Sequence, residues 1–277
     1  MKTLYVSDLD GTLMQPDATL SDTTARLLNE SIASGKLFTV ATARTPATVS
    51  NIIRPLSLNV PAIVMTGASV WNPQSGIYSN IRHFDREAAL KLVEVYRQTG
   101  TNSFIFTLDN NMIDIYHIGG ELNPIQKEFF EERKNSPFKR FHISDEGSDT
   151  LPSDMSKVIL AYTMLPDEKA AATFSASSKL PGIRAQYYHD IYGPEIGILE
   201  AFAADATKAN AVRSLARELK ADRIVCFGDN INDLPMMAVA DVAVAVENAL
   251  PEVKEAADIV IGPNTSDSVA KFIHEDL

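Results

Sequence analysis

Cysteine is almost absent from this 277-residue chain, in which Cys226 is the only one. A single cysteine excludes an intramolecular disulfide, and its place in an apolar run predicts a buried thiol. The chain also lacks any run of the roughly 18 to 20 apolar residues that a membrane span needs, and no basic leader precedes the strand-like segment at its start. We therefore expect a cytoplasmic protein with no membrane partner.

Positive charge is scarce as well. The 25 lysine and arginine residues face 36 aspartate and glutamate residues, which gives a formal net charge of −11. Nucleic acids and anionic membranes attract clustered basic residues, so this balance argues against both as partners. It does not exclude a phosphorylated small molecule, because a metal ion and a few local cations can reverse the field inside a cleft. The five histidines have no ligand-like spacing, which argues against a zinc site.

The pattern of apolar residues divides the chain into three segments. Strand-like apolar runs alternate with helical spacing over residues 1–82 and again over residues 197–277, whereas residues 83–196 mix helices with antiparallel hairpins. We expect an α/β domain made of 1–82 and 197–277, with 197–202 as one of its strands, interrupted by an inserted α+β domain at 83–196. The alternative, one continuous sheet with long excursions, is less favoured because long structureless detours are uncommon.

A chemical signal lies where the first apolar run ends, in the sequence Asp8-Leu9-Asp10-Gly11-Thr12. Alternate residues of a strand point the same way, so Asp8 and Asp10 are expected to project from one side of a strand end, where open α/β sheets bind ligands. Two carboxylates this close favour a cation between them, and Mg²⁺ suits oxygen ligands. A carboxylate can also accept a phosphoryl group, so we assign Asp8 as nucleophile and Asp10 as acid/base. The simpler alternative is a strand followed by an Asp-Gly turn.

Two further polar residues stand at helix starts. Thr42 follows the apolar run 37–41, just before a helix expected to begin at Thr45-Pro46, and helix N-termini favour anions. Lys208 opens a helix at a position that disfavours a cation, which suggests that it faces a negative group. Taken alone, Thr42 also fits a capping residue and Lys208 a solvated surface residue.

A metal-binding pattern follows the apolar run 223–227. The turn reads Gly228-Asp229-Asn230-Ile231-Asn232-Asp233 and precedes a helix. Acids and amides on such a turn form a natural cage for a cation. A helix cap of the same composition is the alternative, but it does not explain why this turn and the Asp8 turn both end parallel strands.

Together these segments resemble the motifs of the haloacid dehalogenase superfamily of phosphatases. The first motif matches Asp8 to Thr12, the second is a Thr at a strand end, the third is a Lys, and the fourth, Gly-Asp-x-x-Asn-Asp, matches 228–233 without departure. The place of the insertion is similar to that in the Cof-like, sugar-phosphatase-like subgroup with a large α/β cap of type C2 (subclass IIB). Three positions differ from the residues common in that subgroup, namely Ala43 and Ala209, where Gly is usual, and Thr66, where Asn is usual.

The resemblance implies a Rossmann-like, doubly wound, mostly parallel core sheet and a cap that selects the substrate. It implies a Mg²⁺-dependent phosphatase that hydrolyses a phosphate monoester of a small metabolite, such as a sugar phosphate, through an aspartyl-phosphate. The implied catalytic residues are Asp8 and Asp10. The implied phosphate-binding residues are Leu9, Thr42, Ala43, Lys208 and Asn232. The implied metal ligands are Asp8, Asp10, Asp229 and Asp233.

Three alternative functions stay open. A phosphotransferase or mutase would use the same site and pass the phosphoryl group to a second hydroxyl. A signalling receiver domain also phosphorylates an Asp, but its acidic cluster and its phosphorylated Asp lie on different strands. A non-catalytic phosphate-binding protein is disfavoured because nucleophile, acid/base, lysine and metal ligands are all present. No obligate protein partner is evident from the sequence.

Overall fold

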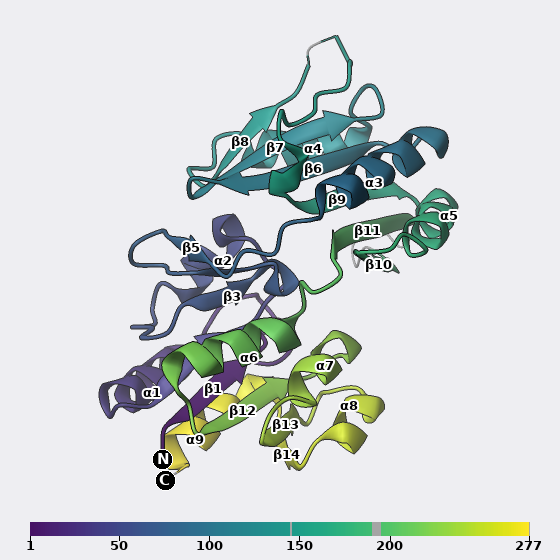
Figure 1. The fold of residues 1–277 in the computed structure, drawn as a ribbon. Helices are drawn as coiled ribbons and strands as arrows, with labels where there is room; N and C mark the ends of the chain where they lie inside the picture. The colour runs from purple at the N-terminus through teal and green to yellow at the C-terminus, as the bar shows by residue number, and fades with distance from the viewer. Residues whose placement is uncertain (145, 190–194, 277) are drawn as a thin grey trace. The chain divides into compact units, whose positions relative to one another are not determined.

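The computed structural model of the protein describes residues 1–144, 146–189 and 195–276. Two compact units divide the chain (Figure 1): the first combines Met1–Asn80 with Thr207–Leu277, and the second is Ile81–Ala206. The second unit begins two residues before the expected insertion at 83–196 and ends ten residues after it. A parallel sheet in the first unit and a mainly antiparallel sheet in the second confirm the predicted fold class.

The first unit is built on a five-stranded parallel sheet. Its strands, in sheet order, are β14 (Ile259–Ile261), β13 (Val242–Val246), β12 (Arg223–Gly228), β1 (Thr3–Ser7) and β2 (Leu37–Val40). Strand β1 lies between β12 and β2, and its last residue, Ser7, is opposite Phe227 and Val40. Four of the five residues of β1 are buried, as expected for a strand covered on both faces. The carboxyl ends of these three neighbouring strands therefore lie side by side.

Helices and short helical turns complete the first unit. They are α1 (Asp22–Ala33), α2 (Pro46–Ile53), η1 (Met65–Gly67), α6 (Lys208–Leu219), η3 (Ile231–Asp233), α7 (Leu234–Met237), α8 (Pro251–Ala256), η4 (Asn264–Ser266) and α9 (Ser268–Glu275). Helix α6 begins after Thr207, whose hydroxyl oxygen accepts the Asn210 N–H at 3.1 Å. This cap places Lys208 at the first helical residue, as the sequence predicted.

A second, smaller sheet of the first unit contains β3 (Ala62–Val64), β4 (Ser69–Trp71) and β5 (Tyr78–Ser79), all antiparallel. A single parallel bridge between Ala41 and Ile63 connects the end of β2 to β3. The turn η1, between β3 and β4, is thereby held close to the end of β2.

The second unit contains a six-stranded sheet. Its strands, in sheet order, are β10 (Ile183–His189), β11 (Ile196–Ala203), β9 (Val158–Pro166), β6 (Ser103–Asp109), β7 (Met112–Ile118) and β8 (Lys139–His142). All neighbours are antiparallel except the parallel pair β7 and β8. Its helical segments are α3 (Arg86–Gln98), α4 (Pro124–Arg133), η2 (Met155–Lys157) and α5 (Asp167–Ser177). Residues of α3 pack with residues of β6, β9 and β11 in its hydrophobic core.

One sequence expectation about this unit was wrong. The segment 197–202 does form a strand, but it is β11, which pairs antiparallel with β9 and β10 and not with the parallel sheet of the first unit. An apolar run of this length predicts a buried strand without indicating its partner. The part of the chain that the structure describes contains no helix with both the length and the apolar character needed to cross a membrane.

Candidate active site

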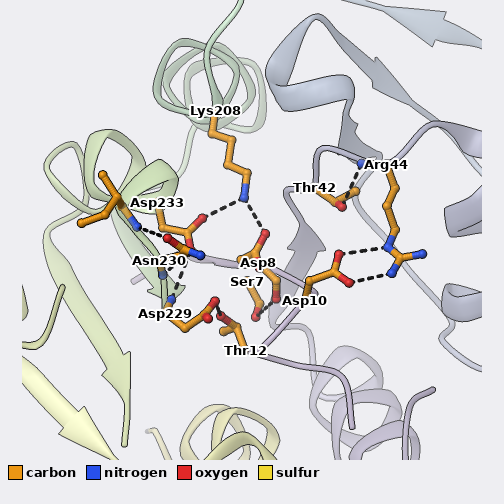
Figure 2. A network of polar contacts seen from close by, with 11 residues as sticks. Ser7, Asp8, Asp10, Thr12, Thr42, Arg44, Lys208, Asp229, Asn230 and Asp233 are labelled. Carbon is orange, nitrogen blue, oxygen red and sulfur yellow. Dashed lines mark hydrogen bonds and ion pairs between the residues drawn. The ribbon is translucent and has the colours of Figure 1, made fainter. Parts of the chain in front are cut away.

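The candidate site lies at the carboxyl ends of β1, β2 and β12 (Figure 2). Asp8 follows the last residue of β1, Asp229 follows the last residue of β12, and Thr42 comes two residues after the end of β2. Parallel strands that are neighbours bring their carboxyl ends together, so residues far apart in sequence meet at one edge of the sheet.

Lys208 connects two of the carboxylates. Its ammonium group donates to Asp8 Oδ1 at 2.5 Å and to Asp233 Oδ1 at 2.8 Å, and its side chain is only 2% exposed. Burial alone would lower the pKa of Lys208, but the charges of Asp8 and Asp233 outweigh it and raise that pKa above its ordinary value. Lys208 is therefore a permanent cation inside the site, which confirms that it faces negative groups.

Asp8 is held in an almost dry environment, with a side chain that is 9% exposed. Burial raises the pKa of Asp8 to about 7, with Asp233 and Asp229 adding to the effect and Lys208 opposing it. A single ammonium cannot balance the nearby carboxylates, so one of them is costly to ionise without a further positive charge.

Asp229 is positioned by its neighbours in the first motif. The Thr12 hydroxyl donates to Asp229 Oδ1 at 2.8 Å. Gly11, at φ +77°, lies so close that a Cβ there would be 2.4 Å from Asp229 Oδ2. Asp233 Oδ2 accepts the backbone N–H groups of Asp229 and Asn230 at 3.1 and 3.2 Å, which fixes the turn after β12.

Three carboxylates could hold one metal ion. Asp8, Asp229 and Asp233 each offer one oxygen, and these oxygens lie within 4.8 Å of one another. Burial raises the pKa of Asp229 to about 6, so Asp8 and Asp229 are both harder to ionise than an ordinary aspartate, even with Lys208 nearby. Three carboxylates against one lysine leave excess negative charge, and an oxygen donor set suits a hard divalent cation.

Asp10 lies outside this group of three. Strand β1 ends at Ser7, so the alternation expected to place Asp8 and Asp10 together does not extend to them. Figure 2 shows Asp8 directed toward Lys208 and Asp10 directed toward Arg44. Arg44 donates from Nε to Asp10 Oδ2 at 2.9 Å and from Nη2 to Asp10 Oδ1 at 2.6 Å. A metal-binding role for Asp10 stays a prediction.

The remaining predicted residues surround this arrangement. Thr42 is 1% exposed, and its hydroxyl oxygen accepts the Arg44 N–H at 3.1 Å. Ala43 is not among the residues with positive φ, so a glycine is not required there. Leu9 is fully buried in the turn after β1, and Asn232 is exposed in η3. Their phosphate-binding roles stay predictions.

Sequence reasoning noted Thr66 as a departure from the residue usual in the subgroup but did not predict the turn η1 that contains it. Met65, Thr66 and Gly67 all have left-handed φ angles of 51°, 56° and 90°. The Thr66 N–H donates to the Thr42 carbonyl at 3.0 Å, and the Thr66 hydroxyl is buried without a hydrogen-bond partner among the residues that the structure describes. A Cβ on Gly67 would be 2.3 Å from the Thr207 carbonyl oxygen, so this strained turn supports both the end of β2 and the start of α6. Only the pair Thr66-Gly67 hinted at it in the sequence.

Residues 5–273 match the sequence model of the haloacid dehalogenase-like hydrolases. Pyridoxal phosphate phosphatase YbhA of Escherichia coli is 25% identical over 98% of this chain and 97% of its own. The phosphatase YitU of Bacillus subtilis, named for 5-amino-6-(5-phospho-D-ribitylamino)uracil, is 22% identical over 98% and 96%. The solved structure of the subclass IIB sugar phosphatase BT4131 matches with a TM-score of 0.69 and 20% identity, over 99% of this chain and 98% of its own.

The chain therefore belongs to the haloacid dehalogenase-like hydrolases. The family predicted from the motifs is confirmed, and the match extends over nearly the whole chain.

Proposed function

We propose that this protein is a Mg²⁺-dependent phosphatase that hydrolyses a phosphate monoester of a small metabolite. The observation that carries the proposal is the arrangement of buried Asp8, Lys208 and Asp233 with half-buried Asp229 at one edge of the parallel sheet. It combines a carboxylate nucleophile, a fixed cation and an oxygen cage for a metal, which are the parts that phosphoryl transfer requires.

In the first step, a carboxylate oxygen of Asp8 attacks the phosphorus in line with the ester oxygen. The bond from phosphorus to the ester oxygen breaks, and Asp10 gives its proton to the leaving alkoxide. Asp8 then carries the phosphoryl group as a mixed anhydride. Lys208, already 2.5 Å from Asp8 Oδ1, stabilises negative charge on the phosphoryl oxygens.

In the second step, Asp10 takes a proton from a water molecule that attacks the phosphorus of the aspartyl-phosphate. The bond between phosphorus and the Asp8 oxygen breaks, inorganic phosphate leaves, Asp8 is again a carboxylate and Asp10 is again protonated. Asp10 suits both proton transfers because its side chain is 55% exposed and can reach solvent and a leaving group, whereas Asp8 is enclosed.

A divalent cation fits Asp8, Asp229 and Asp233. Their oxygens are close enough to share one ion, and burial of excess negative charge raises the pKa of Asp8 and Asp229. When bound, Mg²⁺ would supply positive charge that neutralises the phosphate and lowers its repulsion of the nucleophile. Thr12 would keep Asp229 turned toward the ion.

We also propose that the second unit, Ile81–Ala206, selects the leaving group and that a sugar phosphate is among the substrates. The names of the relatives support a phosphate monoester but differ in the molecule attached, from pyridoxal to a ribitylamino-uracil and a sugar. Transfer of the phosphoryl group to a second hydroxyl would use the same site. An assay must therefore identify the products as well as measure the loss of substrate.

The decisive experiment is a screen of phosphorylated metabolites with Mg²⁺, with and without EDTA, in which inorganic phosphate is measured. We expect turnover that EDTA abolishes and Mg²⁺ restores. Asp8→Asn should lose several orders of magnitude in kcat because an amide is a poor nucleophile, and Asp229→Ala should need more Mg²⁺ for half-maximal rate. Asp22→Asn, at an exposed position in the first turn of α1, is the matched control and should be unchanged.

Acid quenching during turnover with a ³²P-labelled substrate should trap label on the wild-type protein and none on Asp8→Asn. Full activity of Asp8→Asn would contradict the covalent mechanism. An unaltered rate in EDTA would show that the carboxylate cage has been misinterpreted.

A further inference from the structure

The two aspartates of the first motif differ in how they are held. Asp8 is fixed by burial and by Lys208, but the side chain of Asp10 is 55% exposed and follows the end of β1. An exposed carboxylate on a turn samples several rotamers unless a partner selects one. The hydrogen bonds found for the Asp10 carboxylate among the described residues all come from Arg44.

The contact between Arg44 and Asp10 is bidentate. Nε and Nη2 of Arg44 reach the two different oxygens of Asp10, at 2.9 and 2.6 Å (Figure 2). A planar guanidinium that donates two parallel hydrogen bonds fixes the plane of the carboxylate as well as its distance. A lysine ammonium in the same place would supply the charge without defining that plane.

Arg44 is itself anchored at both ends of its backbone. Its N–H donates to the Thr42 hydroxyl at 3.1 Å, and its carbonyl accepts the Met65 N–H at 3.0 Å. The guanidinium therefore extends from a backbone fixed between the end of β2 and the turn η1. Through this contact, the position of Asp10 depends on β2 as well as on β1.

Stability alone does not account for this pair. Its side chains are 29% and 55% exposed, so solvent screens the attraction between the two charges. The geometry instead suits proton transfer. When Asp10 carries the proton for the leaving group, that oxygen donates and gives up one Arg44 contact, while the other contact keeps the carboxyl group in place.

We propose that Arg44 is a positioning residue that orients the Asp10 carboxyl group for proton transfer to the leaving oxygen. The inference rests on the proposed phosphatase activity. It predicts that the loss of kcat/KM on replacing Arg44 is larger for a leaving group that needs a proton than for one that does not. An alkoxide needs one, whereas p-nitrophenolate leaves without one.

The test compares kcat/KM for glycerol 2-phosphate and for p-nitrophenyl phosphate. This parameter covers the steps up to formation of the aspartyl-phosphate and excludes its hydrolysis. Arg44→Met should lower kcat/KM for the alkyl ester by roughly 10- to 100-fold, the scale of a misplaced catalytic group, and should lower it less than about threefold for p-nitrophenyl phosphate. The kcat/KM of Arg44→Lys on the alkyl ester should fall between those of wild type and Arg44→Met, because lysine retains the positive charge but cannot donate two parallel hydrogen bonds. Arg26→Met, which removes an exposed Arg26–Glu30 pair on α1, is the matched control.

A double-mutant cycle with Asp10→Asn tests whether Arg44 acts through Asp10. In the Asp10→Asn background, Arg44→Met should cause little additional loss on the alkyl ester. Millimolar guanidinium should partly restore Arg44→Ala on the alkyl ester and not on p-nitrophenyl phosphate.

Equal losses on both esters would overturn the proposal, because they would assign Arg44 to the phosphate or to the fold. Unchanged kinetics on the alkyl ester would overturn it as well, and so would full additivity with Asp10→Asn. If Arg44→Met fails to fold by circular dichroism, the ester ratio of Arg44→Lys decides the question. Absence of wild-type activity on both esters would instead count against the proposed function.

Discussion

Replacing Lys208 by methionine removes the buried cation that contacts Asp8 and Asp233, and it keeps a side chain of similar length. The Lys208 side chain is 2% exposed, and those of its partners Asp8 and Asp233 are 9% and 0% exposed. In metal-free protein, Lys208→Met leaves these two carboxylates without the ammonium group that contacts both of them. Removing one member of a buried ion pair typically costs about 3–5 kcal/mol, and we expect a loss of unfolding free energy in that range near neutral pH.

The loss should depend on pH in a defined direction. Burial already raises the pKa of Asp8 to about 7, and loss of the opposing Lys208 charge raises it further. An acid whose pKa is higher in the folded state binds a proton that the unfolded state has released, so the free energy of unfolding falls as pH rises. The penalty of Lys208→Met should therefore be largest above about pH 7 and smaller near about pH 5, where the folded variant keeps a protonated carboxyl group.

Urea unfolding followed by circular dichroism, in EDTA at about pH 5.5 and about pH 8, measures this difference. Saturating Mg²⁺ at the higher pH should recover part of the lost stability, since a cation replaces the missing charge. Lys271→Met, at an exposed position in α9, is the control and should stay within about 0.5 kcal/mol. A loss below about 1 kcal/mol, or the same loss at both pH values, would refute the reasoning.

Two further predictions concern the turn η1 and the second unit. Gly67→Ala should destabilise the protein and lower kcat, because the new Cβ would be 2.3 Å from the Thr207 carbonyl at the start of the helix that carries Lys208. Gly35→Ala, at a similar positive φ with open space around it, measures the backbone cost alone, and equal losses in both would contradict the steric argument. Burial raises the pKa of Glu200 to about 7 from 4.5, so wild-type stability should fall by up to about 3 kcal/mol as pH rises through that interval. Glu200→Gln should flatten this dependence in urea titrations at several pH values, and an unaltered slope would count against it.

The parallel core could be predicted because its strands are buried on both faces and therefore appear as near-continuous apolar runs. The run 223–227 matches β12 to within one residue, whereas the first run was expected to reach Asp10, three residues beyond the end of β1 at Ser7. Ligand sites lie at carboxyl ends of such strands, so Asp8 and Asp229 could be assigned to one site before any contact was known. The contacts of Asp229 with Thr12 and of Asp8 with Lys208 depend on the order of the strands in the sheet. The apolar runs do not indicate that order.

Two features could not be predicted for distinct physical reasons. Strand β11 was assigned to the first domain because an apolar run does not indicate whether its partners are parallel or antiparallel. The pairing of Asp10 with Arg44 depends on where β1 stops and on a contact between residues 34 positions apart. One residue more or less of strand would change which side Asp10 faces.

Lys208 is an example of a contact that could be predicted from a local feature of the sequence. A cation at the first residue of a helix is unfavourable by the helix dipole, and that cost must be offset by something outside the helix. The sequence alone therefore indicated a negative partner, and the structure places two carboxylates within 2.8 Å of its ammonium group. The three consecutive left-handed residues of η1 are also locally unfavourable. Their φ angles are a property of the backbone, and in the sequence only the pair Thr66-Gly67 indicates them. An unfavourable charge such as that of Lys208 can be recognised from the sequence, whereas an unfavourable backbone conformation such as that of η1 is recognised mainly from the structure.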